Sequence, residues 1–165
     1  SDLTGVPPAL REVAAKPFAS EKKPSDISSL ATYVVGQSKG IKMAVSTKHP
    51  KVKESYEIGK RIFNYRAGPY DFACSTCHAT SGVRIRMQDL PNFHVKKDAQ
   101  SAYVSWPAYR VSQGLTRSFQ WRLNDCFRQQ RFPEPKFASE ATVALTTYLA
   151  VSANGAEYVG PGLKR

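Results

Sequence analysis

The clearest helical patterns in the chain lie in residues 52–65 and 139–155. In the first segment, apolar or small side chains recur every three or four positions and form one stripe: Val52, Tyr56, Gly59, Ile62 and Phe63. In the second segment, the corresponding stripe consists of Ala141, Leu145, Tyr148 and Leu149. Because a glycine lets another backbone approach closely, we expect two helices that cross at Gly59 and Tyr148.

Residues typical of helix ends flank both segments. Ser139 is a common N-cap residue, and Glu140 places a negative charge at the positive end of the helix dipole. Gly155 follows the last turn of that helix, and Gly68-Pro69 follows the first helix. These end residues agree with the two helices that the stripes predict.

Residues 114–135 predict a third helix, and Pro133 is expected to end it. Its apolar face consists of Leu115, Phe119, Leu123, Cys126 and Phe127. The side chain of Cys126 is therefore expected to point into the interior of the domain.

The rest of the chain is less regular. Residues 83–113 lack clear periodicity and contain two prolines, so they predict loops with short helical pieces. The segment before residue 26 contains Pro7, Pro8, Pro17 and Pro24. A helix is predicted from Asp26 to about Ser38, with Ile27, Leu30 and Val34 on one side. We expect residues 1–50 to form an N-terminal extension or reduced domain packed on the core or on a partner, and residues 51–165 to form the main domain.

Composition and charge narrow the classes of protein. The chain has 165 residues, of which 41% are hydrophobic, which suffices for a real core. No apolar run approaches the roughly 18 residues of a membrane span, and the chain opens without methionine or an apolar leader, so we expect a processed, soluble protein. The net charge of +11 would suit nucleic acid, an anionic surface or an anionic substrate. Arginines dominate the later part of the chain, and guanidinium groups suit oxyanions; charge alone is too little to support a nucleic-acid role.

The segment "CSTCH" contains Cys74, Cys77 and His78 in the C-x-x-C-H spacing of c-type haem attachment. Each thiol can add to one vinyl group of the macrocycle, and the histidine then serves as the proximal iron ligand. No second cysteine pair completes a zinc site, and no βαβ pattern suggests a thioredoxin-like dithiol. The sequence therefore predicts one covalently bound haem c, and with it a periplasmic location.

The iron needs a sixth ligand, water or an open position opposite His78. The candidate side chains are Met43, His49, Met87, His94 and Cys126. Cys126 lies downstream of the haem motif on an inward helix face and has no cysteine partner, so we favour it as the distal ligand. Arg122 lies one helical turn before Cys126 and would favour the thiolate over the thiol. A thiolate ligand favours Fe(III), which suits a catalytic site better than a simple electron shuttle.

The chain from about Gly59 to Gly155 resembles a known family, the SoxA subunits of the SoxAX cytochromes of sulfur-oxidising bacteria. The resemblance runs through "GKRIFNYRAG", "CSTCH", "PAYR", "RLNDCFRQQR" and "SEATVALTTYLAVSANG". Its specific part is R-x-x-x-C followed by S-E-x-x-x-A-L-x-x-Y-L. The resemblance implies a mainly α, class I cytochrome c-like haem domain with an N-terminal extension.

The resemblance also implies an activity: oxidative joining of thiosulfate to a carrier cysteine on SoxY, within SoxYZ, with electrons leaving through a SoxX-type cytochrome subunit. Carried over residue by residue, Cys74 and Cys77 attach the haem, His78 is the proximal ligand, Cys126 is the distal ligand and site of sulfur chemistry, and Arg122 binds the substrate anion. In this family the ligand cysteine can carry an extra sulfur as a persulfide.

Two departures from the family pattern and two rival functions stay open. This chain has a single haem attachment motif, whereas some SoxA chains carry two haems, and it lacks a further arginine in the C-terminal helix; Arg110, Arg128 or Arg131 could supply the second anion contact. The rival functions are a thiosulfate dehydrogenase that forms tetrathionate, and a plain electron-transfer cytochrome c with Met87 as ligand.

Overall fold

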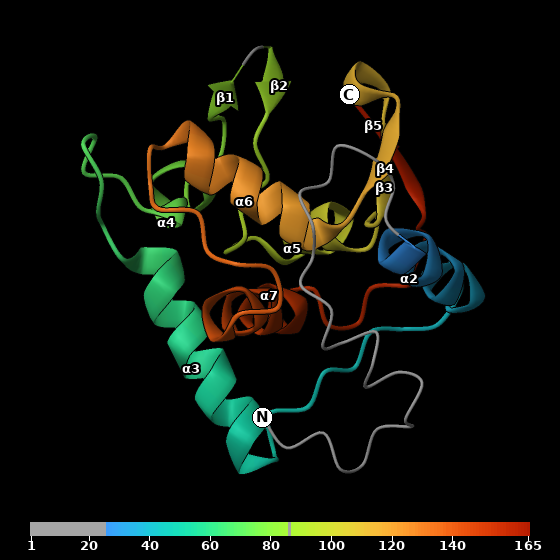
Figure 1. Cartoon of the computed structure of the whole chain (residues 1–165). Helices are drawn as coiled ribbons and strands as arrows, with labels where there is room; N and C mark the ends of the chain where they lie inside the picture. The colour runs from blue at the N-terminus through green and yellow to red at the C-terminus, as the bar shows by residue number, and fades with distance from the viewer. Residues whose placement is uncertain (1–25, 86) are drawn as a thin grey trace.

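The computed structural model describes residues 26–85 and 87–165, and it is mainly helical (Figure 1). In this part of the chain the α-helices are α2 (Asp26–Gln37), α3 (Pro50–Asn64), α4 (Cys74–His78), α5 (Lys96–Tyr103), α6 (Phe119–Gln129) and α7 (Glu140–Ser152). The short strands β1 (Arg84–Ile85) and β2 (Gln88–Asp89) form an antiparallel hairpin. A second sheet has the order β4-β3-β5 and contains β3 (Ala108–Arg110), β4 (Leu115–Arg117) and β5 (Gly162–Lys164).

Helices α3 and α7 cross in close contact, as the sequence predicts (Figure 1). A Cβ atom added at Gly59 would lie 2.0 Å from the carbonyl oxygen of Ala144 and 2.9 Å from the Cβ of Tyr148. The ring of Tyr148 lies 5.5 Å from that of Tyr56 and 5.2 Å from that of Phe63. Only glycine leaves room for this crossing, which forms one side of the hydrophobic core.

The predicted ends of α7 are confirmed. Ser139 is the N-cap residue, and its hydroxyl accepts a hydrogen bond from the backbone N–H of Thr142. Gly155 has a φ of 86°, in the left-handed region that favours glycine, and its N–H donates to the carbonyl of Met43. The chain can therefore turn sharply after this helix and run alongside residues 40–45, which lie between α2 and α3.

The third helix is confirmed as α6, but its predicted start is wrong. Leu115 belongs to strand β4, which pairs with β3, and the helix begins only at Phe119, where the hydroxyl of Ser118 accepts from the N–H of Trp121. A turn with Gly114 at a φ of 65° joins the paired strands. At Leu115, the backbone pairing of β4 with β3 thus outweighs the helical spacing of the apolar side chains.

The region 83–113 is more regular than expected. It contains helix α5 and strands β1, β2 and β3, together with the 3-10 helix η1 (Val111–Gln113). Strands of two or three residues are too short to leave an alternating pattern in the sequence. Strand β3 also pairs in parallel with β5 near the end of the chain, with Arg110 opposite Lys164.

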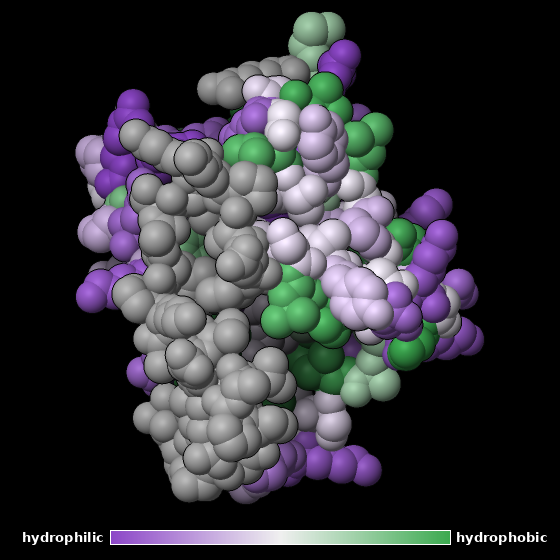
Figure 2. Space-filling view, turned by 45° about the vertical axis from the view of Figure 1, so that its right-hand side comes forward, coloured by the Kyte–Doolittle hydropathy of each residue, from purple (hydrophilic) through white to green (hydrophobic). Residues whose placement is uncertain are grey.

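The predicted helix near residue 26 is confirmed as α2, whereas the proline-containing segment before it lies outside the described residues. Leu30 and Val34 on its expected inner side are 42% and 54% exposed. Figure 2 shows the face on this side of the molecule, where hydrophobic residues appear in several separate places among polar ones. After α2, the chain hydrogen-bonds to the segment that follows α7, from Met43 to Ala156 and from Val45 to Asn154.

The proposed domain boundary between residues 50 and 51 stays a prediction.

Among the helices of the described residues, none is both long enough and apolar enough to cross a lipid bilayer.

Candidate functional site

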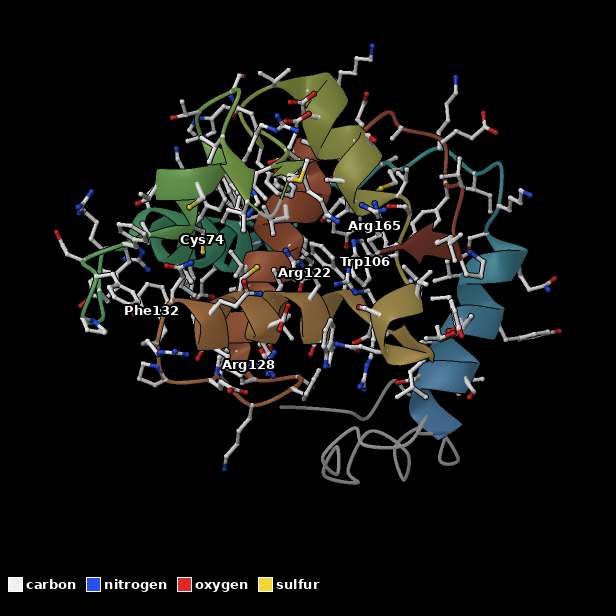
Figure 3. All side chains as sticks on the ribbon, turned by 90° about the horizontal axis from the view of Figure 1, so that it is seen from above. Cys74, Trp106, Arg122, Arg128, Phe132 and Arg165 are labelled. Carbon is white, nitrogen blue, oxygen red and sulfur yellow. The ribbon has the colours of Figure 1, made fainter. Side chains whose placement is uncertain are left out.

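A cavity of about 880 Å³ lies between α4, α5, α6 and the strands β3 and β5. All five side chains predicted for the site line it: Cys74, Cys77, His78, Arg122 and Cys126. The volume falls in the range of sites for small molecules and cofactors. The fold therefore brings the C-x-x-C-H turn and the R-x-x-x-C turn of α6 to the walls of one space (Figure 3).

The C-x-x-C-H residues form the short helix α4. The hydroxyl of Thr76 accepts a 2.9 Å hydrogen bond from the N–H of Ala73 and closes the start of the turn. Cys74 and Cys77 are free thiols, and burial raises the pKa of Cys74 to about 12. The two thiols are thus available on the wall of the cavity and are not joined to each other.

His78 is oriented by the backbone that follows the β1–β2 hairpin. Its Nδ1 lies 2.9 Å from the carbonyl oxygen of Pro91, and a carbonyl can only accept, so Nδ1 carries the proton and Nε2 keeps its lone pair. Burial lowers the pKa of the ring, an effect that this hydrogen bond opposes and the charge of Arg122 adds to. A neutral imidazole with a free Nε2 is the form that binds a metal.

Of the five candidates for the sixth ligand, only Cys126 lines the cavity in the described structure. Met87 is 86% exposed. His49 caps α3, where its Nδ1 accepts from the N–H of Lys51, and His94 is exposed beside Phe63.

The surroundings of Cys126 shift the pKa of its thiol in both directions. Burial raises its pKa most strongly, and Asp125 raises it further, whereas Arg122 and Arg110 lower it. Arg122 acts in the direction expected from the sequence, but burial outweighs it. A thiolate at this depth needs a further positive charge, which a ferric iron supplies; the donor set of two thiols, one neutral imidazole and one buried sulfur therefore fits a covalently attached haem.

Asp125 is a site residue that the sequence reasoning missed. Its carboxylate is 9% exposed and accepts hydrogen bonds from Nη1 of Arg122 at 2.8 Å and from Nε2 of Gln129 at 2.9 Å, and it pairs with Arg128 as well. The spacing of Arg122, Asp125 and Arg128 at three-residue intervals was the signal that could have revealed it. Arg128 is thus committed to Asp125, and it does not line the cavity.

Further cations complete the lining. Arg110 from β3 and Lys164 from β5 contribute to the cavity wall, as does Arg165, whereas Arg131 does not. Trp106 and Arg110 from the "PAYR" region also line it. Nothing local in the sequence marks Lys164 or Arg165 as site residues, because only the parallel pairing of β3 with β5 brings them there.

Comparison with known proteins gives a consistent result, although no family model matches the sequence. The chain is 52% identical over 136 residues to the L-cysteine S-thiosulfotransferase subunit SoxA of Hydrogenophilus thermoluteolus, which covers 82% of this chain and 50% of the relative. It is 39% identical over 138 residues to a SoxA subunit of the same name from Hydrogenobacter thermophilus, covering 83% and 52%.

The fold is similar to a chain in the crystal structure of SoxXA from P. pantotrophus, with a TM-score of 0.77 and 25% identity, over 95% of this chain and 58% of that one. This match confirms the mainly α, cytochrome c-like fold predicted from the sequence. The chain spans about half the length of the curated relatives it matches. Sequence and structure together show that it belongs to the SoxA family.

Proposed function

We propose that this chain is a haem-thiolate cytochrome subunit that joins thiosulfate oxidatively to a cysteine of a carrier protein. The carrier would be SoxY in SoxYZ, the electron acceptor a SoxX-type cytochrome, and the location the periplasm. The carrying observation is that Cys126, alone among the five candidate distal ligands in the described structure, shares a cavity with Cys74, Cys77 and His78. The names of the relatives, L-cysteine S-thiosulfotransferase subunits, agree with this activity.

Four side chains would hold one haem c: Cys74 and Cys77 as thioethers, with His78 and Cys126 as the ligands that the protein would offer to the iron. When bound, the haem supplies an electron acceptor next to the sulfur of Cys126. Joining a carrier thiol to the outer sulfur of thiosulfate forms one S–S bond, releases one proton from the thiol and removes two electrons, which the partner cytochrome would take up.

Within this reaction the protein side chains position the sulfur atoms and balance charge. Arg122 lines the cavity and donates to Asp125 through Nη1, which holds its guanidinium beside Cys126 while other donors of the same group remain for the sulfonate end of thiosulfate. Burial of the site strengthens that contact. Cys126 is the sulfur at which the two substrates meet, and the resemblance to SoxA implies that it can carry an extra sulfur as a persulfide.

The decisive variant is Cys126→Met. We expect the haem to remain covalently attached, because Cys74, Cys77 and His78 are unchanged, and conjugation of thiosulfate to the carrier to fall below detection. Met87→Leu is the matched control, since Met87 is 86% exposed, and it should keep full activity and an unchanged haem spectrum. Retained conjugation in Cys126→Met would refute the proposal, and a lost methionine-ligand signature in Met87→Leu would favour a plain electron-transfer cytochrome.

Two further measurements separate the remaining alternatives. Product analysis with and without the carrier distinguishes conjugation from tetrathionate formation, because a thiosulfate dehydrogenase needs no carrier. Intact mass measurement with peptide mapping shows whether Cys126 bears an additional sulfur and whether the chain carries one haem.

A further inference from the structure

The end of the cavity formed by β3 and β5 is rich in positive charge. Arg110 on β3 lies opposite Lys164 on β5 in the parallel ladder, and both line the cavity together with Arg165. Figure 3 shows Cys74 at one end of the site and Trp106 and Arg165 at the other, with Arg122 between them in this view. The haem attachment turn and the cation cluster of Arg110, Lys164 and Arg165 thus occupy opposite ends of one space.

These cations have no anionic partner within the described part of the chain. The Nε of Arg110 is buried and has no hydrogen-bond acceptor there. The carboxylates that line the same cavity are engaged elsewhere: Asp89 with Arg84, Asp98 with the N–H of Asn92, and Asp125 with Arg122, Arg128 and Gln129.

The neighbouring positive charges affect the protonation of Lys164. Burial lowers the pKa of its ammonium group, and the charges of Arg110 and Arg122 lower it further. A buried donor without an acceptor and a group of mutually repelling cations are both unfavourable unless an anion joins them.

We propose that the cation cluster of Arg110, Lys164 and Arg165 binds the propionate carboxylates of the haem. This inference rests on the haem attachment that the proposed function includes. In a haem the vinyl-bearing edge and the propionate-bearing edge lie on opposite sides of the macrocycle. Thioether bonds at Cys74 and Cys77 hold the vinyl edge at one end of the cavity, so the carboxylates extend towards the other end, where Arg110 and Lys164 lie.

The assignment gives β5 a role in setting the properties of the haem. Arg110 can offer its unpartnered Nε–H together with a second N–H to one carboxylate, and Lys164 adds a point charge from the neighbouring strand. Positive charge near the haem disfavours the ferric state and so raises the reduction potential. The cluster would thereby oppose the lowering of the potential that a thiolate ligand causes.

The test uses the full haem-bearing chain with Arg110→Gln, Arg110→Lys and Lys164→Gln. Arg61→Gln is the control, because Arg61 is exposed on α3 and does not line the cavity. Resonance Raman spectra report the bending mode of the propionates, and spectroelectrochemical titration reports the potential. We expect both Gln variants to shift the propionate mode. We also expect them to lower the reduction potential by about 59 mV, which raises the ferric-to-ferrous ratio at a fixed potential about tenfold.

Arg110→Lys should shift the propionate mode but leave the reduction potential close to that of the wild type. Lysine keeps the positive charge, whereas it lacks the paired N–H donors of the guanidinium group. Arg61→Gln should change neither. An unchanged propionate mode in both Gln variants overturns the inference, and a raised KM for thiosulfate with an unchanged mode would assign the cluster to the substrate instead. A wild-type chain that binds no covalent haem would refute the proposed function itself, which haem quantification detects before any variant is compared.

Discussion

At the scale of single residues, Asp125 decides which arginines are available at the site. Its carboxylate pairs with both Arg122 and Arg128, so the first is held beside Cys126 and the second is kept out of the cavity. The sequence reasoning selected Arg122 but treated Arg128 as an equal alternative to Arg110. A pattern of charges on a helix does not tell which cation an intervening carboxylate will bind.

Replacing Asp125 by Asn should therefore cost stability. The change removes the charge of a nearly buried carboxylate that faces two guanidinium groups, and we expect the free energy of unfolding to fall by about 1–3 kcal/mol. Urea unfolding measures the loss. Asp71→Asn is the matched control, because Asp71 pairs with Arg66 at the surface with side chains 72% and 59% exposed, and it should cost less than about 1 kcal/mol. Equal losses in the two variants would contradict the importance of burial.

At the scale of elements, the apolar stripes predicted α3 and α7 and even the residues at which they cross. The stripe of α6 was misleading at one end, because Leu115 continues the helical spacing yet pairs as a strand. The difference has a physical cause. α3 and α7 bury a continuous face against each other, whereas the start of α6 is set by the hydroxyl of Ser118 and by the strands that precede it.

The crossing of α3 and α7 can be tested with Gly59→Ala. The added Cβ would lie 2.0 Å from the carbonyl oxygen of Ala144, so the helices must separate or shift. We expect a loss of stability of about 1–3 kcal/mol, measured by thermal or urea unfolding. Gly36→Ala in α2 is the control: its Cβ would lie 3.9 Å from the nearest atom, and alanine favours the helix, so stability should stay equal or rise. A Gly59→Ala protein as stable as the wild type would contradict the prediction, because it would show that α3 and α7 can separate without loss of stability.

At the scale of the whole molecule, the net charge of +11 is expected to act on association. If the proposed function holds, the positive field attracts the thiosulfate dianion and favours an acidic docking partner. We predict that the association rate with the carrier protein falls severalfold as ionic strength rises from about 0.05 to 0.5 M, because the Debye length shortens from roughly 14 to 4 Å. Stopped-flow kinetics measures the association rate, and a neutral solute in place of salt serves as the control. An association rate that does not depend on salt would exclude electrostatic steering.

Only part of this site was readable from the amino-acid order. The spacing of Cys74, Cys77 and His78 was enough by itself to predict haem attachment, because five consecutive residues contain all the groups that this prediction needs. The helices α3 and α7 were equally determined, because each depends on a periodicity within its own segment. The tertiary structure alone decided that Cys126 shares a cavity with His78, that Pro91 orients the imidazole, and that Lys164 lies opposite Arg110. These contacts join residues far apart along the chain, and their formation depends on how helices and strands pack, which no local pattern specifies.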